Sequence, residues 1–454
     1  MNLKHSLRRM KVCGILDNLN KEQKNIVFSK DNQVFVNAGP GTGKTHTIVA
    51  FVVNLVLNKG ILPCKIRVLT FTKQTSKMMK KRLKKELGKD LAKYVKVNTF
   101  HSLAFGYMSK LGFLEGRKQA NNEELVKIAK SVARNKKCDL TPQELLNEVL
   151  SIGRKTSYKA KRSDNYKWFV KFYEKLDDGK LWEFDFLLNK MIEKLRMLTS
   201  KSGKQCNNYE YLIVDEYQDC NENQIELLKL LIGKNDRFLF VGDPDQMIYH
   251  WRGARMGYSA KVKKHFECVK VKNLTVNYRS SQEIVKASNR LIANNVNRLP
   301  KVIRAYKSEE GFVGYKRYLN EERQLKGICD LLKDTKGNSA VLCYTNDLRR
   351  SVADFLEVEG FNVKIIGEEV KSEIGKDDIC VMTCHASKGL EFDNVFFPYL
   401  IEYYCGNGED NRRLFYVAMT RARYNLYLFS IDNYRDKGAY VRCKPSKFLK
   451  EIGL

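Results

Sequence analysis

Hydrophobic and polar positions divide the first half of the chain into short apolar runs and longer stretches of helical periodicity. The apolar runs have the length of strands, and each precedes a turn or the start of a helix. They are residues 33–38, 66–72, 209–216 and 237–243. Buried strands that alternate with amphipathic helices are typical of a parallel sheet with helices on both faces. The pattern therefore predicts an α/β domain.

The pattern changes between residues 104 and 204, where the chain is polar, basic and helical in period without a comparable apolar run. The alternation resumes after residue 273, with apolar runs at 339–345, 361–366, 379–383, 394–400 and 425–431. We therefore predict an α/β fold of two domains with one all-helical insertion. The first domain comprises residues 1–103 plus 205–272, the insertion residues 104–204, and the second domain residues 273–454.

The chain is strongly basic, with 82 Lys and Arg against 52 Asp and Glu among its 454 residues, a formal net charge of +30. A surface of that charge repels itself unless polyanions neutralise it, so nucleic acid is the leading partner class. A coding bias toward lysine is the alternative explanation for part of the excess. No apolar run reaches the ~18 residues that a membrane span needs. We expect a cytoplasmic protein, at the nucleoid or at a viral replication site.

The 12 cysteines are scattered and form no C-x-x-C pattern; the closest pair, Cys380 and Cys384, lies in an apolar, strand-like run. We expect reduced cysteines that act as small hydrophobic residues rather than as metal ligands. The basic N-terminal segment lacks the apolar stretch of a secretory signal, although a transit peptide remains an alternative.

A basic run at residues 77–96 places Met78, Leu83, Leu87 and Leu91 at helical spacing. The simpler interpretation is a surface helix whose charged face is solvated. Contact with a DNA backbone is the alternative, because lysines along one helix face suit phosphates.

The segment "AGPGTGKT" follows an apolar run directly and leads into a helical pattern, which is the context that a phosphate-binding P-loop requires. Its glycines let backbone N–H groups point at phosphates. Lys44 supplies a point charge for the outer phosphates, and Thr45 a hydroxyl for Mg²⁺. The predicted loop consists of Ala38, Gly39, Pro40, Gly41, Thr42, Gly43, Lys44 and Thr45.

The segment "YLIVDEYQD" delivers Asp215 and Glu216 at the end of an apolar strand, where open α/β sheets place their ligands. Asp215 is the predicted Mg²⁺ ligand, and Glu216 the general base for an attacking water. Together with the P-loop, these residues predict Mg²⁺-dependent hydrolysis of a nucleoside triphosphate.

The segment "VGDPDQMIYHWRGA" places Tyr249 and Trp251 within five residues of the side-chain amide of Gln246. Phosphate hydrolysis alone does not require aromatic rings at this position. A buried core aromatic is the ordinary interpretation of Trp251. The neighbouring Gln246 and Tyr249 favour a platform on which nucleobases stack.

Several motifs occur in the order found in superfamily 1 helicases of the UvrD/Rep type, which the chain resembles from about residue 19 to its end. They are "LNKEQ", "AGPGTGKT", "LTFTKQTSKMMKKRL", "TFHSLA", "LIVDEYQD", "VGDPDQMIYHWRGA", "VNYRSS", "VMTCHASKGLEFDNVF", "LFYVAMTRAR" and "KPSKFLKEI". The resemblance implies two RecA-like domains that bind ATP in the cleft between them. It also implies directional, 3′→5′ stepping along single-stranded DNA.

The resemblance assigns a role to each matching residue. Gln23 would read the adenine edge, Tyr278 would stack on the base and Glu391 would hold the ribose. Arg279 and Arg421 would contact the γ-phosphate, and Gln246 would sense it. The residues implied to line the DNA channel are Phe71, His101, Tyr249, Trp251, Thr383 and His385.

One departure from the family pattern concerns the second large helical insertion, for which residues 367–378 leave no room. We therefore expect a DNA-stimulated ATPase that needs a protein partner or loading factor to unwind a duplex with a 3′ overhang. Two alternatives stay open. One is a nucleotide-gated DNA-binding subunit that switches a partner such as a nuclease, and the other is an RNA-directed motor.

Overall fold

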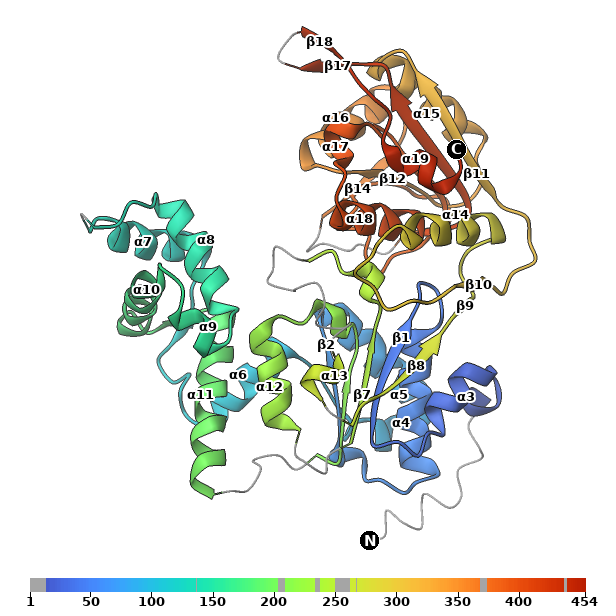
Figure 1. Cartoon of the computed structure of the whole chain (residues 1–454). Helices are drawn as coiled ribbons and strands as arrows, with labels where there is room; N and C mark the ends of the chain where they lie inside the picture. The colour runs from blue at the N-terminus through green and yellow to red at the C-terminus, as the bar shows by residue number, and fades with distance from the viewer. Residues whose placement is uncertain are drawn as a thin grey trace. The chain divides into compact units, whose positions relative to one another are not determined.

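The computed structural model describes residues 14–135, 137–202, 209–232, 237–249, 262–266, 268–367, 374–436 and 439–454. The chain forms two compact units (Figure 1). The first unit comprises Met1–Val36, Lys44–Gly242 and Tyr249–Lys272, and the second Asn37–Gly43, Asp243–Ile248 and Asn273–Leu454. The second unit thus includes two short segments, Asn37–Gly43 and Asp243–Ile248, whose sequence neighbours belong to the first unit.

The first unit is built on a six-stranded sheet with the strand order β3-β2-β6-β7-β1-β8. Strand β2 pairs in parallel with β3 and β6, and β6 pairs in parallel with β7. The strands are β1 (Gln33–Ala38), β2 (Ile66–Thr70), β3 (Lys96–Thr99), β6 (Tyr211–Val214), β7 (Arg237–Gly242) and β8 (Lys270–Leu274). The central strands are buried along almost their whole length, as expected when helices cover both faces.

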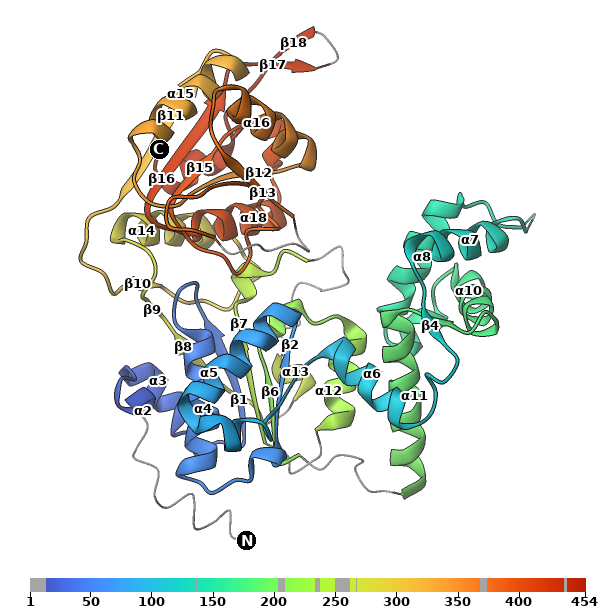
Figure 2. The same ribbon diagram turned by 180° about the vertical axis from the view of Figure 1, so that it is seen from behind.

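Helices α4 and α5 cover one face of this sheet and α12 covers the other (Figures 1 and 2). Helix α4 is buried from Thr47 to Val56, which explains its nearly uninterrupted apolar sequence. The helices are α2 (Gly14–Asp17), α3 (Lys21–Val27), α4 (Lys44–Leu57), α5 (Lys73–Ala92), α6 (Phe100–Lys110), α12 (Glu222–Leu231) and α13 (Val262–His265). Short 3₁₀ turns follow at η1 (Pro63–Lys65), η2 (Tyr217–Asp219) and η3 (Pro244–Gln246).

The segment predicted to be an all-helical insertion contains five helices and also two very short strands. The helices are α7 (Asn122–Ala133), α8 (Pro142–Gly153), α9 (Ser157–Lys161), α10 (Tyr166–Asp178) and α11 (Phe184–Ser202). Strands β4 (Lys118–Gln119) and β5 (Leu181–Trp182) pair in parallel. The all-helical prediction was wrong in this detail, because two-residue strands leave no periodic signal.

The second unit has a six-stranded sheet with the order β11-β16-β15-β12-β14-β13, in which all neighbouring strands are parallel. Its strands are β11 (Phe312–Tyr318), β12 (Ser339–Cys343), β13 (Val363–Ile366), β14 (Ile379–Thr383), β15 (Phe392–Phe397) and β16 (Ala422–Ile431). Its helices are α14 (Gln282–Ala293), α15 (Glu321–Asp334), α16 (Asn346–Val358), α17 (Glu402–Cys405), α18 (Glu409–Met419) and α19 (Lys447–Ile452). Two small pairs complete it: β9 (Val276–Asn277) with β10 (Arg304–Ala305), and β17 (Asn433–Asp436) with β18 (Ala439–Arg442).

The predicted α/β class is confirmed, and every predicted apolar run contains a strand, with ends that differ by a few residues. The prediction missed β3, β8 and β11, each of which lies at an edge of its sheet. Edge strands face solvent on one side and carry more polar residues, so their apolar signal is weak. The predicted domain limits remain a prediction.

The inward face of α5 also differs from its prediction, because Met79 is buried and Met78 is 44% exposed. Leu83, Leu87 and Leu91 point inward as predicted. Among the described residues, no helix combines the length and the apolar character needed to cross a membrane.

Candidate nucleotide and nucleic-acid site

The P-loop connects β1 to α4 through backbone conformations that suit glycine. Gly41 and Gly43 have φ values of 66° and 80°, in the left-handed region. The Thr42 hydroxyl donates to the carbonyl of Gly39 at 2.9 Å. A Cβ added to Gly41 would lie 2.7 Å from Cβ of Arg279. Glycine is therefore required at residue 41 both by conformation and by close packing.

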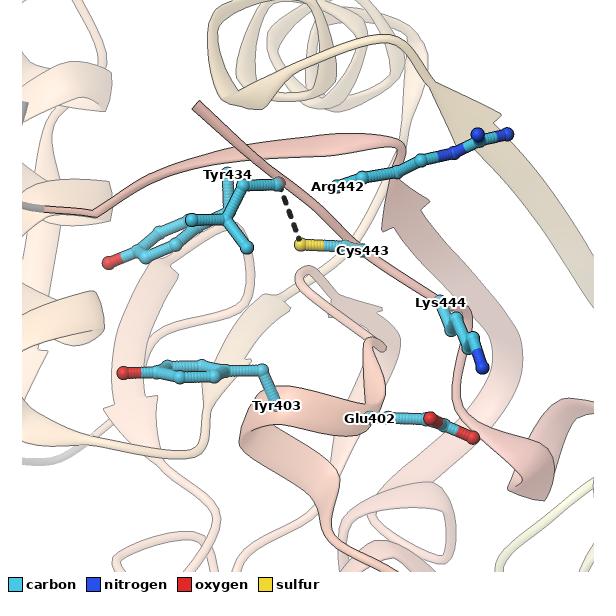
Figure 3. A pocket seen from close by; sticks show the side chains of 7 residues that line it. Glu402, Tyr403, Tyr434, Arg442, Cys443 and Lys444 are labelled. Atoms are coloured by element: carbon cyan, nitrogen blue, oxygen red, sulfur yellow. Dashed lines mark hydrogen bonds between the residues drawn. The ribbon is translucent and has the colours of Figure 1, made fainter. Parts of the chain in front are cut away.

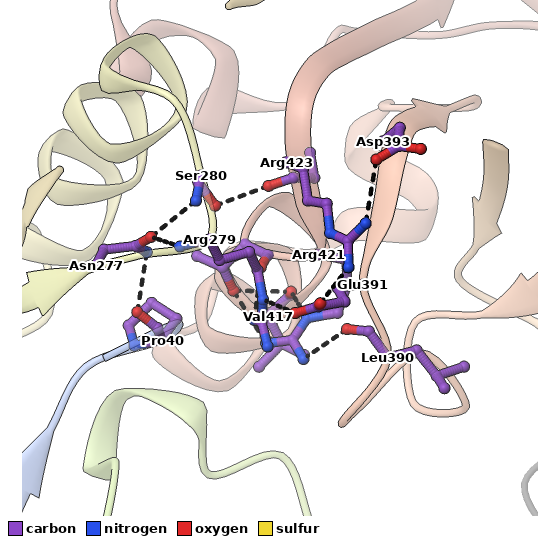
Figure 4. Close-up of polar contacts among 12 residues, drawn as sticks. Pro40, Asn277, Arg279, Ser280, Leu390, Glu391, Asp393, Val417, Arg421 and Arg423 are labelled. Carbon is purple, nitrogen blue, oxygen red and sulfur yellow. Dashed lines mark hydrogen bonds and ion pairs between the residues drawn. The ribbon is translucent and has the colours of Figure 1, made fainter. Parts of the chain in front are cut away.

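Main-chain hydrogen bonds hold the start of motif "VNYRSS" against this loop, within the second unit (Figure 4). The amide of Gly39 donates to the carbonyl of Leu274 at 3.0 Å, and the amide of Tyr278 donates to that of Gly41 at 2.9 Å. The side-chain amide of Asn277 donates to the Pro40 carbonyl at 2.9 Å. The predicted base-stacking residue thus lies next to the predicted phosphate loop.

Lys44 begins α4, and Asp215 follows β6 with 2% of its surface exposed. Burial raises the pKa of Asp215 to about 7 and the charge of Glu216 adds to this, whereas Lys44 lowers it. The Asp215 carboxylate and the Thr45 hydroxyl are hard oxygen donors, which are the kind of ligand that Mg²⁺ prefers.

Glu216 adopts a left-handed backbone conformation with φ 55°, which is unusual for a residue other than glycine. Its amide donates to Oδ1 of Asp215 at 3.0 Å, and its carboxylate accepts from the side-chain amide of Gln218. Strained backbone of this kind concentrates at functional sites. The conformation turns the second carboxylate of the "DE" pair away from the strand direction.

Gln246 ends the 3₁₀ turn η3 and is 3% exposed. Its carbonyl accepts from the Lys388 ammonium at 3.2 Å. Its side-chain nitrogen has no hydrogen-bond partner among the residues that the structure describes. A buried amide donor without a partner is costly, and an anionic oxygen such as that of a phosphate would satisfy it.

A fully buried lysine neutralises the two aspartates that precede Gln246. Lys301 Nζ lies 2.8 Å from Asp243 Oδ1 and 2.8 Å from Asp245 Oδ2, and these three side chains are 0% exposed. It also donates to Oδ1 of Asn37 at 3.2 Å. Arg298 adds a bidentate pair with Asp245 at 3.1 and 2.8 Å. We call these five residues the Lys301 cluster.

Charge pairing in the Lys301 cluster outweighs the cost of burial. Burial alone would lower the pKa of Lys301, but Asp243 and Asp245 raise it. Burial alone would raise the pKa of Asp245, but Lys301 and Arg298 lower it. Lys301, Asp245 and Arg298 are therefore charged at neutral pH.

A second ionic group joins the arginines of the second unit (Figure 4). Arg279 Nε donates to Glu391 at 2.7 Å, and Arg423 pairs with Glu391 and, at 3.2 Å, with Asp393. Burial would raise the pKa of Glu391, but the two guanidinium groups lower it to about 2. The Glu391 carboxylate is thus shared by the residue predicted to contact the γ-phosphate and by Arg423.

Arg421, the predicted arginine finger, is 2% exposed and bonds within its own domain. Its guanidinium donates to the carbonyls of Val417 at 2.8 Å and Leu390 at 3.3 Å, and to the Thr420 hydroxyl at 3.2 Å. Contact between Arg421 and a phosphate remains a prediction.

Two further residues, Tyr278 and Gln23, were predicted to contact the nucleotide. Tyr278 is half-buried and packs on Tyr306, with ring centroids 4.7 Å apart. The side chain of Gln23 is 3% exposed and closes the N-terminus of α3, where its oxygen accepts from the Asn20 amide at 3.1 Å.

The residues predicted to line a DNA channel fall into both units. In the first unit Phe71 packs edge-on against Phe100 at 5.5 Å, and the next residue, His101, stacks on Phe184 at 4.6 Å. Burial lowers the pKa of His101, which keeps the ring neutral at pH 7. Two predicted channel residues, Phe71 and His101, thus lie in one cluster of aromatic side chains with Phe100 and Phe184.

In the second unit, Thr383 ends β14, and its hydroxyl accepts from the amide of Ala386 at 3.2 Å. His385 is half-buried, and so is Tyr249, which belongs to the first unit. Trp251 lies outside the described residues, so its predicted role is untested.

Sequence reasoning assigned no role to Lys301, Arg298, Lys388, Arg423 or Asn277. Arg423, Lys388 and Asn277 lie inside quoted motifs, next to residues that were assigned. For Lys301 and Arg298 the only signal was indirect: "GDPDQ" carries two acidic residues with no basic residue beside them.

A surface pocket of about 270 Å³ lies in the second unit, away from every residue predicted for the site (Figure 3). Tyr403 and Tyr434 stack at its wall, with ring centroids 5.9 Å apart. The pocket is lined by Glu402, Tyr403, Tyr434, Val441, Arg442, Cys443 and Lys444.

The fold and these contacts define a class: a P-loop α/β protein with two parallel-sheet units, in which hydrogen bonds within the second unit join the phosphate loop to the motif that contains Tyr278. Family models then place the chain more narrowly. The UvrD/REP helicase N-terminal domain matches residues 19–267, and the UvrD-like helicase C-terminal domain matches residues 272–371 and 367–433. The chain belongs to the UvrD/REP helicase family, and the predicted resemblance is confirmed.

Named relatives agree with this family. The ATP-dependent DNA helicase Rep of Buchnera aphidicola is 31% identical, over 62% of this chain and 46% of that protein. Rep of Escherichia coli is 33% identical, over 61% of this chain and 43% of that protein. A probable DNA helicase of Mycoplasma pneumoniae is 26% identical, over 96% of this chain and 87% of that protein. The chain thus spans about half the length of the Rep proteins that it matches.

Replacing Lys301 with Met tests the buried cluster. The change leaves two aspartates buried without their shared cation, and breaking a buried ion pair in this way costs roughly 3–5 kcal/mol. We expect a loss of that order in the free energy of unfolding by urea. Lys333→Met, at an exposed lysine, is the control and should change it by less than ~0.5 kcal/mol. Equal stabilities of the two variants would contradict the assigned importance of the cluster.

Proposed function

We propose that the chain is an ATP-dependent translocase and helicase that moves 3′→5′ on single-stranded DNA. The observation that carries this proposal is the set of bonds between the P-loop backbone and the motif that contains Tyr278 and Arg279. These bonds hold the predicted phosphate loop next to the predicted base-stacking residue. Family membership, and the names of the Rep relatives, supply the substrate class.

In this proposal the glycine amides and Lys44 bind the β- and γ-phosphates, and Thr45 and Asp215 hold Mg²⁺. The metal would polarise the γ-phosphate and neutralise the charge that develops there. Glu216 would accept a proton from the attacking water. The unpartnered side-chain nitrogen of Gln246 supports its role as the γ-phosphate sensor.

The remaining nucleotide contacts follow the motif roles. Gln23 and Tyr278 would hold the adenine, and Glu391 the ribose. Arg279 and Arg421 would stabilise the transition state, which requires that both guanidinium groups give up part of their present bonds. Arg279 would exchange Glu391 for phosphate, so nucleotide binding and this ion pair compete.

DNA would bind through stacking on aromatic rings, at ~1–3 kcal/mol for each stacked base. The proposed contacts are Phe71, His101, Tyr249, Trp251, Thr383 and His385. Tyr249 and Trp251 follow Gln246 within five residues. Loss of the γ-phosphate beside Gln246 would therefore change how these two rings contact the DNA bases. Duplex separation in repair, replication or recombination would need a partner protein, because residues 367–378 replace a large helical insertion.

Lys44→Ala tests the ATPase. Loss of the charge on the outer phosphates should lower kcat for ATP hydrolysis by roughly 10²-fold or more, as removal of a transition-state donor does. The steady-state rate with and without single-stranded DNA is the measurement. Lys333→Ala should hydrolyse ATP like the wild type. Normal turnover by Lys44→Ala would mean that the reaction occurs elsewhere.

Trp251→Ala tests the DNA contact. Loss of one stacked base, at ~1–3 kcal/mol, should weaken binding of a dT oligonucleotide by roughly 5–150-fold and leave the DNA-free ATPase within about twofold. Binding is measured by fluorescence anisotropy. Tyr403→Ala, at an exposed tyrosine outside the proposed channel, is the matched control. If Trp251→Ala unfolds the protein instead, the tryptophan is a core residue.

Movement itself separates the motor from a nucleotide-gated clamp. A 3′→5′ motor moves toward the 5′ end of a single strand. The time at which a dye at the 5′ end is released should therefore become shorter as the strand is shortened. A 3′ label should show no such length dependence. ATP hydrolysis without length-dependent release from either end would exclude a motor.

A further inference from the structure

The outer face of α5 is a long and strongly basic helix surface of the first unit. The helix carries eight basic and two acidic residues between Lys73 and Ala92. Residues 73–85 contain six lysines, one arginine and no acidic residue. The six lysines, which we call the lysine band, are Lys73, Lys77, Lys80, Lys81, Lys84 and Lys85, and all are exposed.

Helical geometry places this band on a continuous stripe. Lys73, Lys77, Lys80 and Lys84 follow one another at intervals of four, three and four residues, which keeps them on one face. At 1.5 Å per residue they extend over roughly 16 Å. The helical conformation is interrupted only at Gly88, beyond the band, with φ 75° and ψ 164°.

The band lacks the partners that a merely solvated helix face usually has. Surface helices tend to place Glu and Lys four residues apart, because such pairs stabilise the helix and like charges destabilise it. Here the pairs Lys73–Lys77, Lys77–Lys81, Lys80–Lys84 and Lys81–Lys85 are all like-charged. Within the described part of the chain, no lysine of the band forms an ion pair. A polyanion would relieve this repulsion.

The chemistry of the face favours nucleic acid over a lipid surface. Membrane-bound amphipathic helices bury an apolar face in the bilayer. The apolar face of α5, formed by Met79, Leu83 and Leu87, is already buried in the protein. Met78 alone adds an exposed apolar side chain between residues 73 and 85. A face of lysines without apolar neighbours is suited to phosphates.

The start of the helix connects the band to the proposed DNA contacts. Phe71 follows β2 directly, and Thr72 caps α5 by accepting from the Thr75 amide at 3.0 Å. The first lysine of the band is therefore two residues from Phe71, which packs against Phe100 beside His101. A strand bound at Phe71 and His101 has the lysine band in reach of its backbone.

We propose that the lysine band is a binding surface for the phosphate backbone of nucleic acid that extends beyond the stacking residues. This inference rests on the proposed function, since it takes DNA as the substrate. The band would add affinity without base specificity, because phosphate contacts carry no sequence information. Its contribution would fall steeply with salt.

The test replaces Lys73, Lys77, Lys80 and Lys84 with Gln, which preserves helix propensity. Binding of dT12, dT40 and a duplex with a 3′ overhang is measured by anisotropy at several salt concentrations. We expect the Kd for dT40 to rise at least ~10-fold at low salt, and the slope of log K against log salt to fall by about 2–3. Binding of dT12 should stay within about twofold.

Two further variants control this test. The first control makes the same change in net charge at exposed lysines of α7 and α15, by replacing Lys127, Lys130, Lys326 and Lys333 with Gln. It should leave the slope of log K against log salt for dT40 unchanged. Arg at the four α5 positions should retain wild-type binding. Circular dichroism should show the Gln variant of α5 folded, because the change removes repulsion.

The outcomes separate this inference from the function on which it rests. A loss restricted to dT40 supports the band as a single-strand surface, and a loss restricted to the duplex substrate supports it as a duplex surface. An α5 variant that binds all substrates like the control variant would overturn the inference. Wild-type protein that fails to bind dT12 would instead overturn the proposed function.

Discussion

The turn that carries Gln246, the proposed phosphate sensor, depends on one buried cation. Asp243 caps the 3₁₀ turn that ends at Gln246, accepting from the Asp245 amide at 3.1 Å. A carboxylate with no solvent exposure is unfavourable unless a cation pairs with it. Lys301 supplies that cation and reaches Asn37 at the end of β1 as well. One ammonium group thereby contacts both the strand that leads into the P-loop and the turn that ends at Gln246.

This arrangement explains why the chain divides as it does. Residues 37–43 and 243–248 group with the second unit although their sequence neighbours belong to the first. The Lys301 cluster and the backbone bonds from Leu274 and Tyr278 to the P-loop account for that grouping. Buried ion pairs are poor sources of net stability but strong determinants of which partners meet. The cluster therefore specifies position more than it adds free energy.

Much of the fold and the core of the site could be predicted because their signals are local. The P-loop is one contiguous segment, and Asp215 follows a continuous apolar strand, so each is visible in a few residues. Edge strands such as β3 and β11 were not predicted, because the polar residues on their exposed side interrupt the apolar pattern. Lys301 escaped because its partners lie more than fifty residues earlier in the chain. No local pattern marks a lysine as buried until the two aspartates that require it are known to face it.

The arginines of the second unit were assigned roles from short motifs, but their bonding partners lie far away in the sequence. Arg279 and Glu391 are separated by more than a hundred residues, and each was assigned a different part of the nucleotide. Their pairing makes the two assignments interdependent. Arg423 pairs with the same carboxylate, so Glu391 keeps a cationic partner if Arg279 turns to phosphate. The Glu391 side chain is 40% exposed, so Arg423 and solvent can balance its charge without Arg279. The contacts of Arg423 thus support the proposal that Arg279 changes partners when nucleotide binds, while the pairs of Arg423 with Glu391 and Asp393 stay intact.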